Sequence, residues 1–532
     1  MSSVGPQQTG VLRRTPTIAI PSDVTCPAGF HELRARVDPD GLCWIFGDSR
    51  WSWGDAWDDI RRFAGALRRE GVVYGDRIAF LDSLNPAIIM AMHAACLIGA
   101  ADVVVDPRLA PDEIEYILRD SGAKVLFVGH EHEPTIATLL EEHPAITIVL
   151  VGGPSDELEP WLAGAERLDQ QVDVTPDDPC LVLYSSGTTG RPKGIVLTQH
   201  NVMMHARRAW GDLDFADGDM ILLTAMMFHP CAVLGAATGT PGIVVATWSI
   251  ELLTAALDAG LTHAFLTPSF IGRLHRAGPQ VMSRFAGLKT VTYGGAPMPT
   301  PLLRAAIDAW PSTQLRQVYG MTETVAVLTV LDDSAHRDAD HPERLLSAGR
   351  PIPGVEVRTV DPVTRRDVAP GGAGELWFRT EQTTPGFLHD SRATAELVVG
   401  DRWVRSGDIG SVDASGFVFV VDRIKDLILH NEDTVYPSEV ERVLAEHPNV
   451  LESAVIGVPD KVSGESVKAV VVPRPGSSVD TTELIAFTRV RLALHKTPQS
   501  VDIVTTLPRN SLGKVLKRTL RDPYWAASQR RI

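Results

Sequence analysis

Cysteine, positive charge and unbroken apolar segments are all scarce in this sequence, and each scarcity excludes a class of protein. Five cysteines are dispersed over 532 residues, none in a Cys-x-x-Cys pair, so we expect reduced thiols in the cytoplasm rather than a disulfide framework. The formal net charge of -16 disfavours a nucleic-acid-binding protein, because such proteins usually carry a basic stripe. No basic-then-apolar signal peptide opens the chain, and residues 1–20 are predicted to form a loose tail.

Two long apolar segments are interrupted in ways that argue against a membrane span. Residues 221–250 contain no Asp, Glu, Lys or Arg, but Pro230, Pro241 and several glycines break the run, which predicts a buried strand–helix–strand unit. Residues 86–105 are similarly apolar but include His93 and Asp102, so we expect them to lie in a core. No membrane-spanning segment is therefore predicted.

The pattern of elements indicates an α/β protein. The chain is too long for a single hydrophobic core, so two or more domains are expected. Helical patterns alternate with short apolar runs typical of strands, which predicts parallel sheets. The expected helices are 55–70, 92–97 and 111–121, and the expected strands are 78–81, 102–105 and 124–128.

A small group of histidines and glutamates follows the last of these strands. It reads His130-Glu131-His132-Glu133. Because the histidines sit two apart at a strand end with no third ligand cluster nearby, we expect a solvated loop rather than a metal site.

The segment 185–194 is the most informative stretch of the chain. It joins the apolar strands predicted at 181–184 and 195–197, and reads Ser-Ser-Gly-Thr-Thr-Gly-Arg-Pro-Lys-Gly. Glycines let successive backbone N–H groups approach an anion, the hydroxyls add donors, and Lys193 adds positive charge. This combination predicts a polyphosphate-binding loop rather than a solvated turn. It is not a Walker A motif, because Pro192 precedes the lysine and a strand, not a helix, follows; a P-loop phosphotransferase is therefore disfavoured.

The segment resembles the phosphate loop of the adenylate-forming superfamily, which includes acyl-CoA synthetases, peptide-synthetase adenylation domains and luciferases. Family-like motifs follow in order as far as Lys514, and acyl- or aryl-CoA ligases are the best match. The resemblance implies an α/β fold with a large N-terminal domain of parallel and mixed sheets flanked by helices, a β-barrel-like subdomain, and a small mobile α+β C-terminal lid. The expected boundaries are 21–422 for the large domain, 423–426 for the hinge and 427–532 for the lid.

The resemblance also implies roles for particular residues. Tyr319 would stack on adenine, Thr322 would contact phosphate, and Glu323 with Thr188 would hold Mg²⁺. Asp408 would accept hydrogen bonds from the ribose hydroxyls, Arg423 would reach ribose or phosphate, and Lys425 would lie at the hinge. The implied ATP-binding residues are Ser185, Ser186, Gly187, Thr188, Thr189, Gly190, Lys193, Gly295, Ala296, Pro297, Tyr319, Gly320, Met321, Thr322, Asp408, Arg423 and Lys514.

The remaining implied residues concern catalysis and the acid. The expected catalytic residues are Lys514, Glu323, Lys193 and His229, and the expected acyl-pocket residues are His229, Cys231, Gly235, Tyr293, Gly294 and Val325. Relatives that activate α-amino acids carry an aspartate after the phenylalanine that matches Phe228, whereas His229 follows it here. A free amine is therefore not expected in the substrate, and an uncharged aliphatic or aromatic tail is.

These residues together predict an acid–thiol ligase that uses ATP and Mg²⁺. A carboxylic acid would become an acyl-adenylate with release of pyrophosphate, and the acyl group would pass to a thiol, with CoA as the expected acceptor. Relatives commonly read Gly-Gly-Glu-Asn in the loop beside the pantetheine arm, where this chain reads Asn431-Glu432-Asp433-Thr434. A carrier protein or a non-thiol acceptor therefore stays open, as does a non-catalytic nucleotide-binding relative. A monomer or a homodimer is expected.

Overall fold

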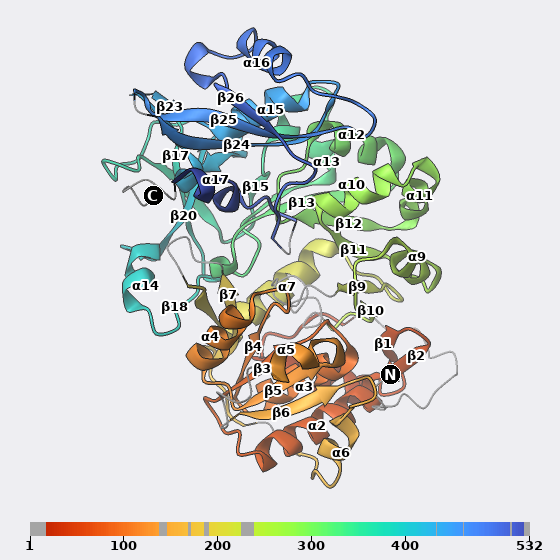
Figure 1. Ribbon diagram of the computed structural model, residues 1–532. Coiled ribbons are helices and arrows are strands. Elements are labelled where there is room, and N and C mark those ends of the chain that lie inside the picture. The colour runs from red at the N-terminus through yellow and green to blue at the C-terminus, as the bar shows by residue number, and fades with distance from the viewer. Residues whose placement is uncertain are drawn as a thin grey trace. The chain divides into compact units, whose positions relative to one another are not determined.

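The computed structural model describes residues 18–137, 146–168, 172–185, 191–224, 239–431, 433–460, 462–510 and 513–525. The chain divides into two compact units, which Figure 1 shows as ribbons. The first comprises Met1–Pro342 with Arg379–Arg402, and the second comprises Glu343–Phe378 with Trp403–Ile532. The predicted tail falls largely outside the described residues, and the predicted domain boundaries stay a prediction.

One sheet of the first unit carries the hairpin that surrounds segment 185–194. Its strand order is β18-β8-β7-β4-β3-β5-β6. Strands β4, β3, β5 and β6 run parallel, as the alternating pattern predicted, and β7 pairs with β8 in antiparallel fashion. The bounds are β3 Arg77–Leu81, β4 Ala101–Val104, β5 Val125–Gly129, β6 Thr147–Val151, β7 Pro179–Ser185, β8 Lys193–Thr198 and β18 Gly386–Phe387.

A further sheet of the first unit has the strand order β14-β13-β12-β11-β9-β10-β1-β2. Its central strands are parallel, so the carboxyl ends of β12 and β13 meet at one edge. The bounds are β1 Leu42–Phe46, β2 Ser49–Ser52, β9 Ile221–Thr224, β10 Gly242–Val245, β11 His263–Leu266, β12 Thr290–Gly294, β13 Gln314–Tyr319 and β14 Thr329–Leu331.

Helices with apolar faces pack on these sheets. Helix α2, Trp53–Arg69, begins with a capping box between Ser52 and Asp55 and buries Ile60 and Phe63, which satisfies its first N–H groups and fixes its start. The other helices of this unit are α1 Pro27–Val37, α3 Pro86–Leu97, α4 Pro111–Ser121, α5 Glu133–Ala137, α6 Leu158–Leu162, α7 Gln199–Leu213, α9 Ile250–Asp258, α10 Pro268–Arg276, α11 Pro279–Arg284, α12 Thr300–Ala309, α13 Asp333–His336 and α14 Ser391–Leu397.

The second unit contains two smaller sheets. In the first of them β16, β17 and β20 are neighbours and β21 pairs with β20; in the other the order is β23-β22-β25-β24, with β26 parallel to β25. The strand bounds are β16 Glu356–Val360, β17 Gly374–Arg379, β20 Trp403–Val412, β21 Val418–Arg423, β22 Ile428–His430, β23 Asp433–Val435, β24 Val450–Asp460, β25 Gly464–Pro473 and β26 Ser500–Ile503. The helices are α15 Pro437–Ala445, α16 Thr481–Arg489 and α17 Lys517–Trp525, and two short strands elsewhere in the chain are β15 Arg350–Pro351 and β19 Val398–Val399.

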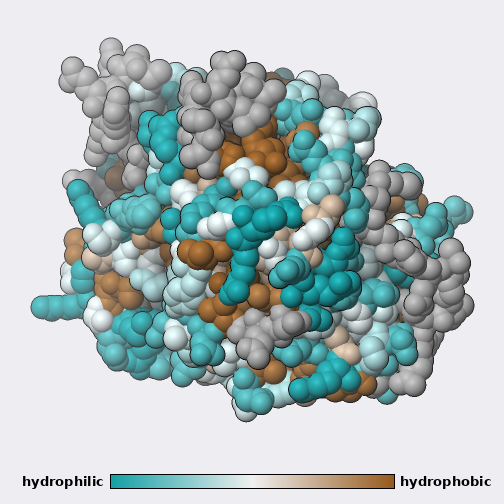
Figure 2. Space-filling model, turned by 90° about the horizontal axis from the view of Figure 1, so that it is seen from below, coloured by the Kyte–Doolittle hydropathy of each residue, from teal (hydrophilic) through white to brown (hydrophobic). Residues whose placement is uncertain are grey.

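Both units have hydrophobic cores of their own, and the fold class is the α/β class that the sequence predicted. Every residue of α3 is buried, as expected for the apolar segment 86–105. Of the other apolar segment, β9 and β10 are seen, whereas 225–238 lies outside the described residues. No helix among the described residues is long and apolar enough to cross a bilayer. Figure 2 shows a largely hydrophilic face on which apolar side chains gather in several separate areas.

The cysteines in the described part of the chain form no disulfide. Cys26, Cys43, Cys96 and Cys180 are all buried as thiols, and Cys231 lies outside the described residues. Burial raises the pKa of the Cys43 thiol well above its usual value, because the low-dielectric interior disfavours the thiolate. Cys43 is therefore a small apolar core residue rather than a reactive one.

Candidate active site

The β7–β8 hairpin holds the ends of the predicted phosphate loop. Ser185 and Lys193 lie opposite each other in the antiparallel register, so both ends of the loop are anchored in a sheet. The residues between them that carry most of the predicted donors, Ser186, Gly187, Thr188, Thr189 and Gly190, lie outside the described residues. The structure therefore confirms the strand–loop–strand frame, and the phosphate role stays a prediction.

Lys193 points its ammonium group toward the segment that follows β18. Its Nζ lies 3.0 Å from a carboxylate oxygen of Asp390 and 5.5 Å from the ring centre of Phe387. Asp390 also accepts a hydrogen bond from the N–H of Ala393, at 2.8 Å, as the N-cap of α14. These two interactions, with the backbone N–H first, lower the pKa of Asp390, which favours its ionised carboxylate. The sequence reasoning missed Asp390, because no local pattern links it to Lys193.

The carboxyl ends of β12 and β13 bring two of the predicted nucleotide segments together. Gly294 lies beside Val318 in the parallel register, and a Cβ at Gly294 would come within 2.4 Å of the Val318 carbonyl oxygen. A Cβ at Gly320 would come within 2.0 Å of the Ala326 carbonyl oxygen. Glycine is therefore required at both positions for the close approach of backbones. Gly295, Ala296 and Pro297 follow β12, and Tyr319 ends β13, at the same edge of the sheet.

Glu323 sits in a tight turn that is followed by two residues in the left-handed region. Thr322–Thr324 form a 3₁₀ turn, and the carbonyl of Glu323 accepts a hydrogen bond from the N–H of Thr384 at 2.8 Å. Val325 and Ala326 then adopt φ of 55° and 76°. A positive φ is costly for a β-branched residue, and such strain concentrates at functional sites. The strained backbone at Val325 and Ala326 is typical of a functional site, and the Mg²⁺ role of Glu323 stays a prediction.

Backbone bonds and packing hold the strained pair in place. The N–H of Val325 bonds to Thr322, that of Ala326 to Met321, and that of Leu328 to Tyr319. Val325 is fully buried and belongs to the main apolar core of its unit. Its predicted place in the acyl pocket stays a prediction.

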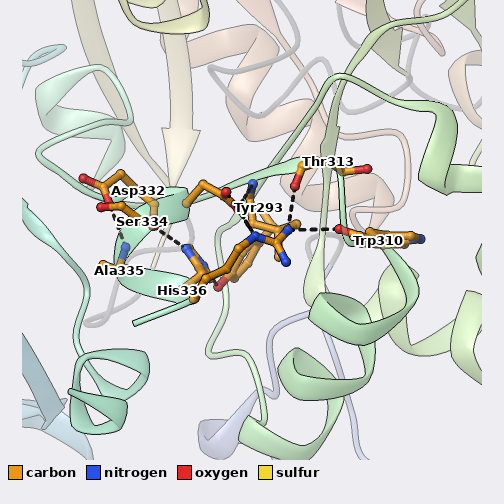
Figure 3. A network of polar contacts seen from close by, with 10 residues as sticks. Tyr293, Trp310, Thr313, Asp332, Ser334, Ala335 and His336 are labelled. Atoms are coloured by element: carbon orange, nitrogen blue, oxygen red, sulfur yellow. Dashed lines mark hydrogen bonds and ion pairs between the residues drawn. The ribbon is translucent and has the colours of Figure 1, made fainter. Parts of the chain in front are cut away.

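Tyr293, another predicted pocket residue, has its hydroxyl engaged within the protein. Figure 3 shows this hydroxyl directed at His336, whose Nε2 lies 2.7 Å away. A second contact, at 3.2 Å, reaches Oε1 of Gln317 on the neighbouring strand. Burial lowers the pKa of His336, so a neutral imidazole accepts or donates here. Three other predicted pocket residues, His229, Cys231 and Gly235, lie outside the described residues.

In the second unit, the structure pairs Asp408, which the sequence assigned to the ribose, with Arg423, which it assigned to ribose or phosphate. Asp408 on β20 and Arg423 on β21 lie opposite each other in the antiparallel register. The guanidinium Nε of Arg423 is 3.1 Å from Oδ1 of Asp408. The carboxylate is almost fully buried, whereas the arginine is more exposed.

Lys514 joins this charged pair although it lies far along the chain. Its backbone N–H donates to Oδ1 of Asn510 at 2.9 Å, and the N–H of Asn510 donates to the Lys514 carbonyl at 2.8 Å. Between them Gly513 adopts φ of 79°, which completes a tight loop. The loop places the ammonium group close enough to Asp408, Arg423 and Lys425 for their charges to change its pKa.

The electrostatics of Lys514 follow from this position. The pKa of Lys514 is lowered from 10.5 to about 7, first by burial and then by the neighbouring charge of Arg423, while Asp408 acts in the opposite direction. The pKa of Lys425 is also lowered, first by burial and then by Arg423. A cluster of cations around one buried carboxylate is a local excess of positive charge in an acidic protein. It suits an anionic ligand, because an anion would offset the repulsion among the cations.

Comparisons with known proteins were made on the whole chain. Residues 31–388 match the family model for the AMP-binding enzyme, and residues 439–514 match the model for the AMP-binding enzyme C-terminal domain. The chain is 35% identical to a feruloyl-CoA synthase of Amycolatopsis sp., over 92% of this chain and 97% of the relative. It is also 35% identical to the fatty acid–[acyl-carrier-protein] ligase ScoC of Streptomyces coeruleorubidus, over 89% and 92%.

A solved structure supports the same assignment. The crystal structure of ATP-bound MatB from Rhodopseudomonas palustris has a TM-score of 0.85 and 25% identity, and covers 94% of this chain and 99% of MatB. The two family models together span the hairpin, the β12–β13 edge and Lys514, and the Asp408–Arg423 strand pair lies between the two matched ranges. The chain belongs to the AMP-binding enzyme family, the adenylate-forming superfamily that its motifs indicated.

Proposed function

We propose that this protein is an AMP-forming acid–thiol ligase. It activates a carboxylic acid with ATP to an acyl-adenylate, releases pyrophosphate, and transfers the acyl group to a thiol, with CoA as the expected acceptor. The observation that carries the proposal is the meeting of Lys514 with Asp408 and Arg423. Three residues that the family motifs assign to ribose and phosphate lie in one cluster. The names of the relatives, a feruloyl-CoA synthase and a fatty acid ligase, support the reaction class.

The chemistry explains why cations are needed. A carboxylate is a poor acyl donor, and adenylation replaces oxide by AMP as the leaving group. The carboxylate oxygen attacks the α-phosphorus, forms the mixed anhydride and expels pyrophosphate. Both reactants are anions, so catalysis consists mainly of positioning and placing positive charge. Under the proposal, the ammonium of Lys514 offsets charge at the carboxylate and the α-phosphate, and Asp408 binds the ribose hydroxyls.

The first unit supplies the proposed triphosphate and metal groups. Lys193 and the loop 185–190 would bind the β- and γ-phosphates, and Tyr319 would stack on adenine. Glu323 and Thr188 would hold Mg²⁺, which suits oxygen ligands and neutralises phosphate charge. The fit of Glu323 is chemical: a carboxylate beside a polyphosphate requires a cation between them.

A pyrophosphate-release assay tests the proposal directly. The protein would be incubated with ATP, Mg²⁺ and a panel of aryl and aliphatic acids that includes ferulic acid and fatty acids of several lengths. We expect release with at least one neutral-tailed acid, and accumulation of acyl-adenylate when the thiol is left out. Lys514→Ala should abolish release with that acid while retaining ATP binding. Absence of release with every acid, from protein shown to bind ATP, would favour a non-catalytic nucleotide-binding relative.

A carrier protein is the second candidate acceptor, and the β22–β23 turn favours it. Asn431 adopts φ of 58°, a conformation in which glycine is normally preferred, at a position where relatives commonly have glycine. Asp433, beyond Glu432, is exposed and lies 4.0 Å from His495. Bulk and negative charge at this turn would oppose the approach of an anionic cofactor such as CoA.

The acceptor can be decided by measuring the second half-reaction. Acyl-adenylate made in place would be offered CoA or a carrier protein with its phosphopantetheine arm. The matched variant is Asn431→Gly with Glu432→Gly, which restores the glycine pair without disturbing the left-handed backbone. If CoA is the natural acceptor, the native chain should already transfer to it quickly. If the native chain prefers the carrier protein and the variant gains CoA activity, the turn selects the acceptor.

A further inference from the structure

A group of metal-ligand side chains lies in the first unit, outside the residues assigned to ATP and the acid. Asp82 directly follows β3, and Glu131 and His132 lie in a 3₁₀ turn directly after β5. Strands β3 and β5 are parallel neighbours, with Leu81 beside Val128. Their carboxyl ends therefore meet, and the adjacent labels in Figure 1 show the two strands side by side.

This place is a switch point in the topology of the sheet. The strand order β4-β3-β5-β6 means that the chain leaves β3 for β4 on one side and later returns to place β5 on the other. Connections thus diverge at the carboxyl ends of β3 and β5. In open α/β sheets such points form the crevices in which ligands bind.

The three side chains converge in a way that suits one ion. Their candidate ligand atoms, two carboxylate oxygens and an imidazole nitrogen, all lie within 4.8 Å of one another. Asp82 is only 9% exposed. Nε2 of His132 is buried and has no hydrogen-bond partner in the part of the chain that the structure describes. Its approach to Oε1 of Glu131 is 3.7 Å, too long for a hydrogen bond.

Asp82 is held in position by the residues around it. Its Oδ1 accepts the N–H of Ser83 at 2.6 Å, and its Oδ2 accepts the side-chain amide of Asn85 at 2.8 Å. Asn85 in turn caps α3 through the N–H of Ile88. A Cβ at Gly129 would lie 2.1 Å from Oδ1 of Asp82, so a glycine is needed at the end of β5. The carboxylate is thus fixed against the β5 turn before any ion binds.

A cation between these groups would relieve the cost of burying the Asp82 carboxylate and would give the buried Nε2 of His132 a partner.

We propose that Asp82, Glu131 and His132 bind one divalent transition-metal ion, of the Zn²⁺ class, at the carboxyl ends of β3 and β5. A mixed set of imidazole and carboxylate ligands favours such an ion over Mg²⁺. Water would complete the coordination. The ion would tie the ends of two central strands together, and its role is structural and separate from the proposed ligase reaction.

Equilibrium dialysis of the full-length protein against Zn²⁺, followed by metal analysis, tests this site. His132→Gln removes one ligand, and His130→Gln is the matched control, because it removes a neighbouring imidazole of the same turn. We expect the native protein and the control to bind one more ion than His132→Gln, or to bind it at least about tenfold more tightly. Zn²⁺ should also raise the melting temperature of the native protein and the control but not of His132→Gln.

Asp82→Asn provides a second variant, which should lose the same ion while its amide can still cap the local turn. Circular dichroism would verify that each variant is folded. Equal Zn²⁺ binding by the native protein and both ligand variants would overturn the site, and Asp82 would then serve only to hold Asn85 at the start of α3. Pyrophosphate release in Mg²⁺ should be unchanged in His132→Gln, so failure of this site and failure of the ligase proposal are distinguishable.

Discussion

The ammonium group of Lys193 lies 3.0 Å from a carboxylate oxygen of Asp390. The lysine ends the predicted phosphate loop, and the aspartate caps a helix that begins almost two hundred residues later. A pair of this kind holds the lysine in a defined direction and competes with an anionic ligand for its charge. Because both side chains are partly exposed to water, which screens their charges, the pair contributes little to stability.

Variants of Lys193 and Asp390 should distinguish the contribution of the lysine charge to adenylation from the competition of the aspartate for that charge. Lys193→Ala should reduce adenylation by about 10²–10³, because it removes a preorganised cation. Asp390→Asn should keep the helix cap and lower the KM for ATP by no more than about fivefold, since only competition is removed. Pyrophosphate release at varied ATP measures both. Asp401→Asn, at an exposed pair with Arg379, is the control, and a large loss in Asp390→Asn would contradict a mere competitor role.

Lys514 should impose a pH limit on adenylation. Its pKa is lowered to about 7 in the free protein, chiefly by burial, and the ammonium form is the one that offsets anionic charge. The kcat/KM for adenylate formation, which reports the free protein, should therefore fall as the pH rises above about 7. The kcat should stay level to higher pH, because bound ATP brings negative charge that raises the lysine pKa.

The variant Lys425→Met tests the cause of this pH limit. Lys425 lowers the pKa of Lys514 through like-charge repulsion, so its neutralisation should move the alkaline fall of kcat/KM to higher pH. Lys514→Arg, which stays charged, should lose the fall altogether at reduced rate. An alkaline fall that stays in place in both variants would assign it to another group.

A variant of Tyr293 tests whether its hydroxyl group stabilises the folded protein or selects the acid substrate. Tyr293→Phe should lower the free energy of unfolding by about 1–3 kcal/mol, because it leaves the buried His336 without its hydroxyl partner. The ring stays in place, so preference among acids should not change. Denaturant titration measures the first quantity and the acid panel the second. A change in acid preference at unchanged stability would show that the hydroxyl, rather than the ring, serves the substrate.

Two buried histidines should make the first unit sensitive to acid. His31 and His93 meet edge to face at 4.3 Å between ring centres, and Nδ1 of His93 lies 2.8 Å from the Ile89 carbonyl oxygen. Burial lowers the pKa of His93 to about 4 and that of His31 well below its usual value. The folded-state values lie below the unfolded value near 6.5, so the unfolded chain takes up protons first.

The free energy of unfolding should therefore fall as the pH drops from about 6.5 toward about 4, by up to roughly 1.4 kcal/mol per pH unit for His93. Denaturant midpoints between about pH 7 and about pH 5 measure the slope. His93→Asn should show a shallower slope than the native chain, whereas His341→Asn, at an exposed position, should not. Equal slopes in all three proteins would mean that other groups govern acid sensitivity.

Local sequence determined most of the secondary structure and the order of the motifs. The parallel strands around residues 78–128, the β7–β8 hairpin and the buried α3 were all expected, and each is present. Apolar periodicity, caps and glycine positions act over a few residues, so they can be recognised in the chain itself. The requirement for glycine at 294 is different, because it comes from the neighbouring strand, where a Cβ would meet the Val318 carbonyl oxygen.

The sequence could not show which distant groups would meet. No local sequence pattern predicts that Asp390 pairs with Lys193. Likewise, no pattern around Asp82 predicts its proximity to Glu131 and His132, and the local sequence of those two residues predicted only a solvated loop. Strand order decides these encounters: β3 and β5 become neighbours although β4 separates them in the chain. Likewise, the motifs named Asp408, Arg423 and Lys514, but only folding gathered them and lowered the lysine pKa to about 7. Burial and the field of neighbouring charges are properties of the tertiary structure, and they determine the protonation state on which the chemistry depends.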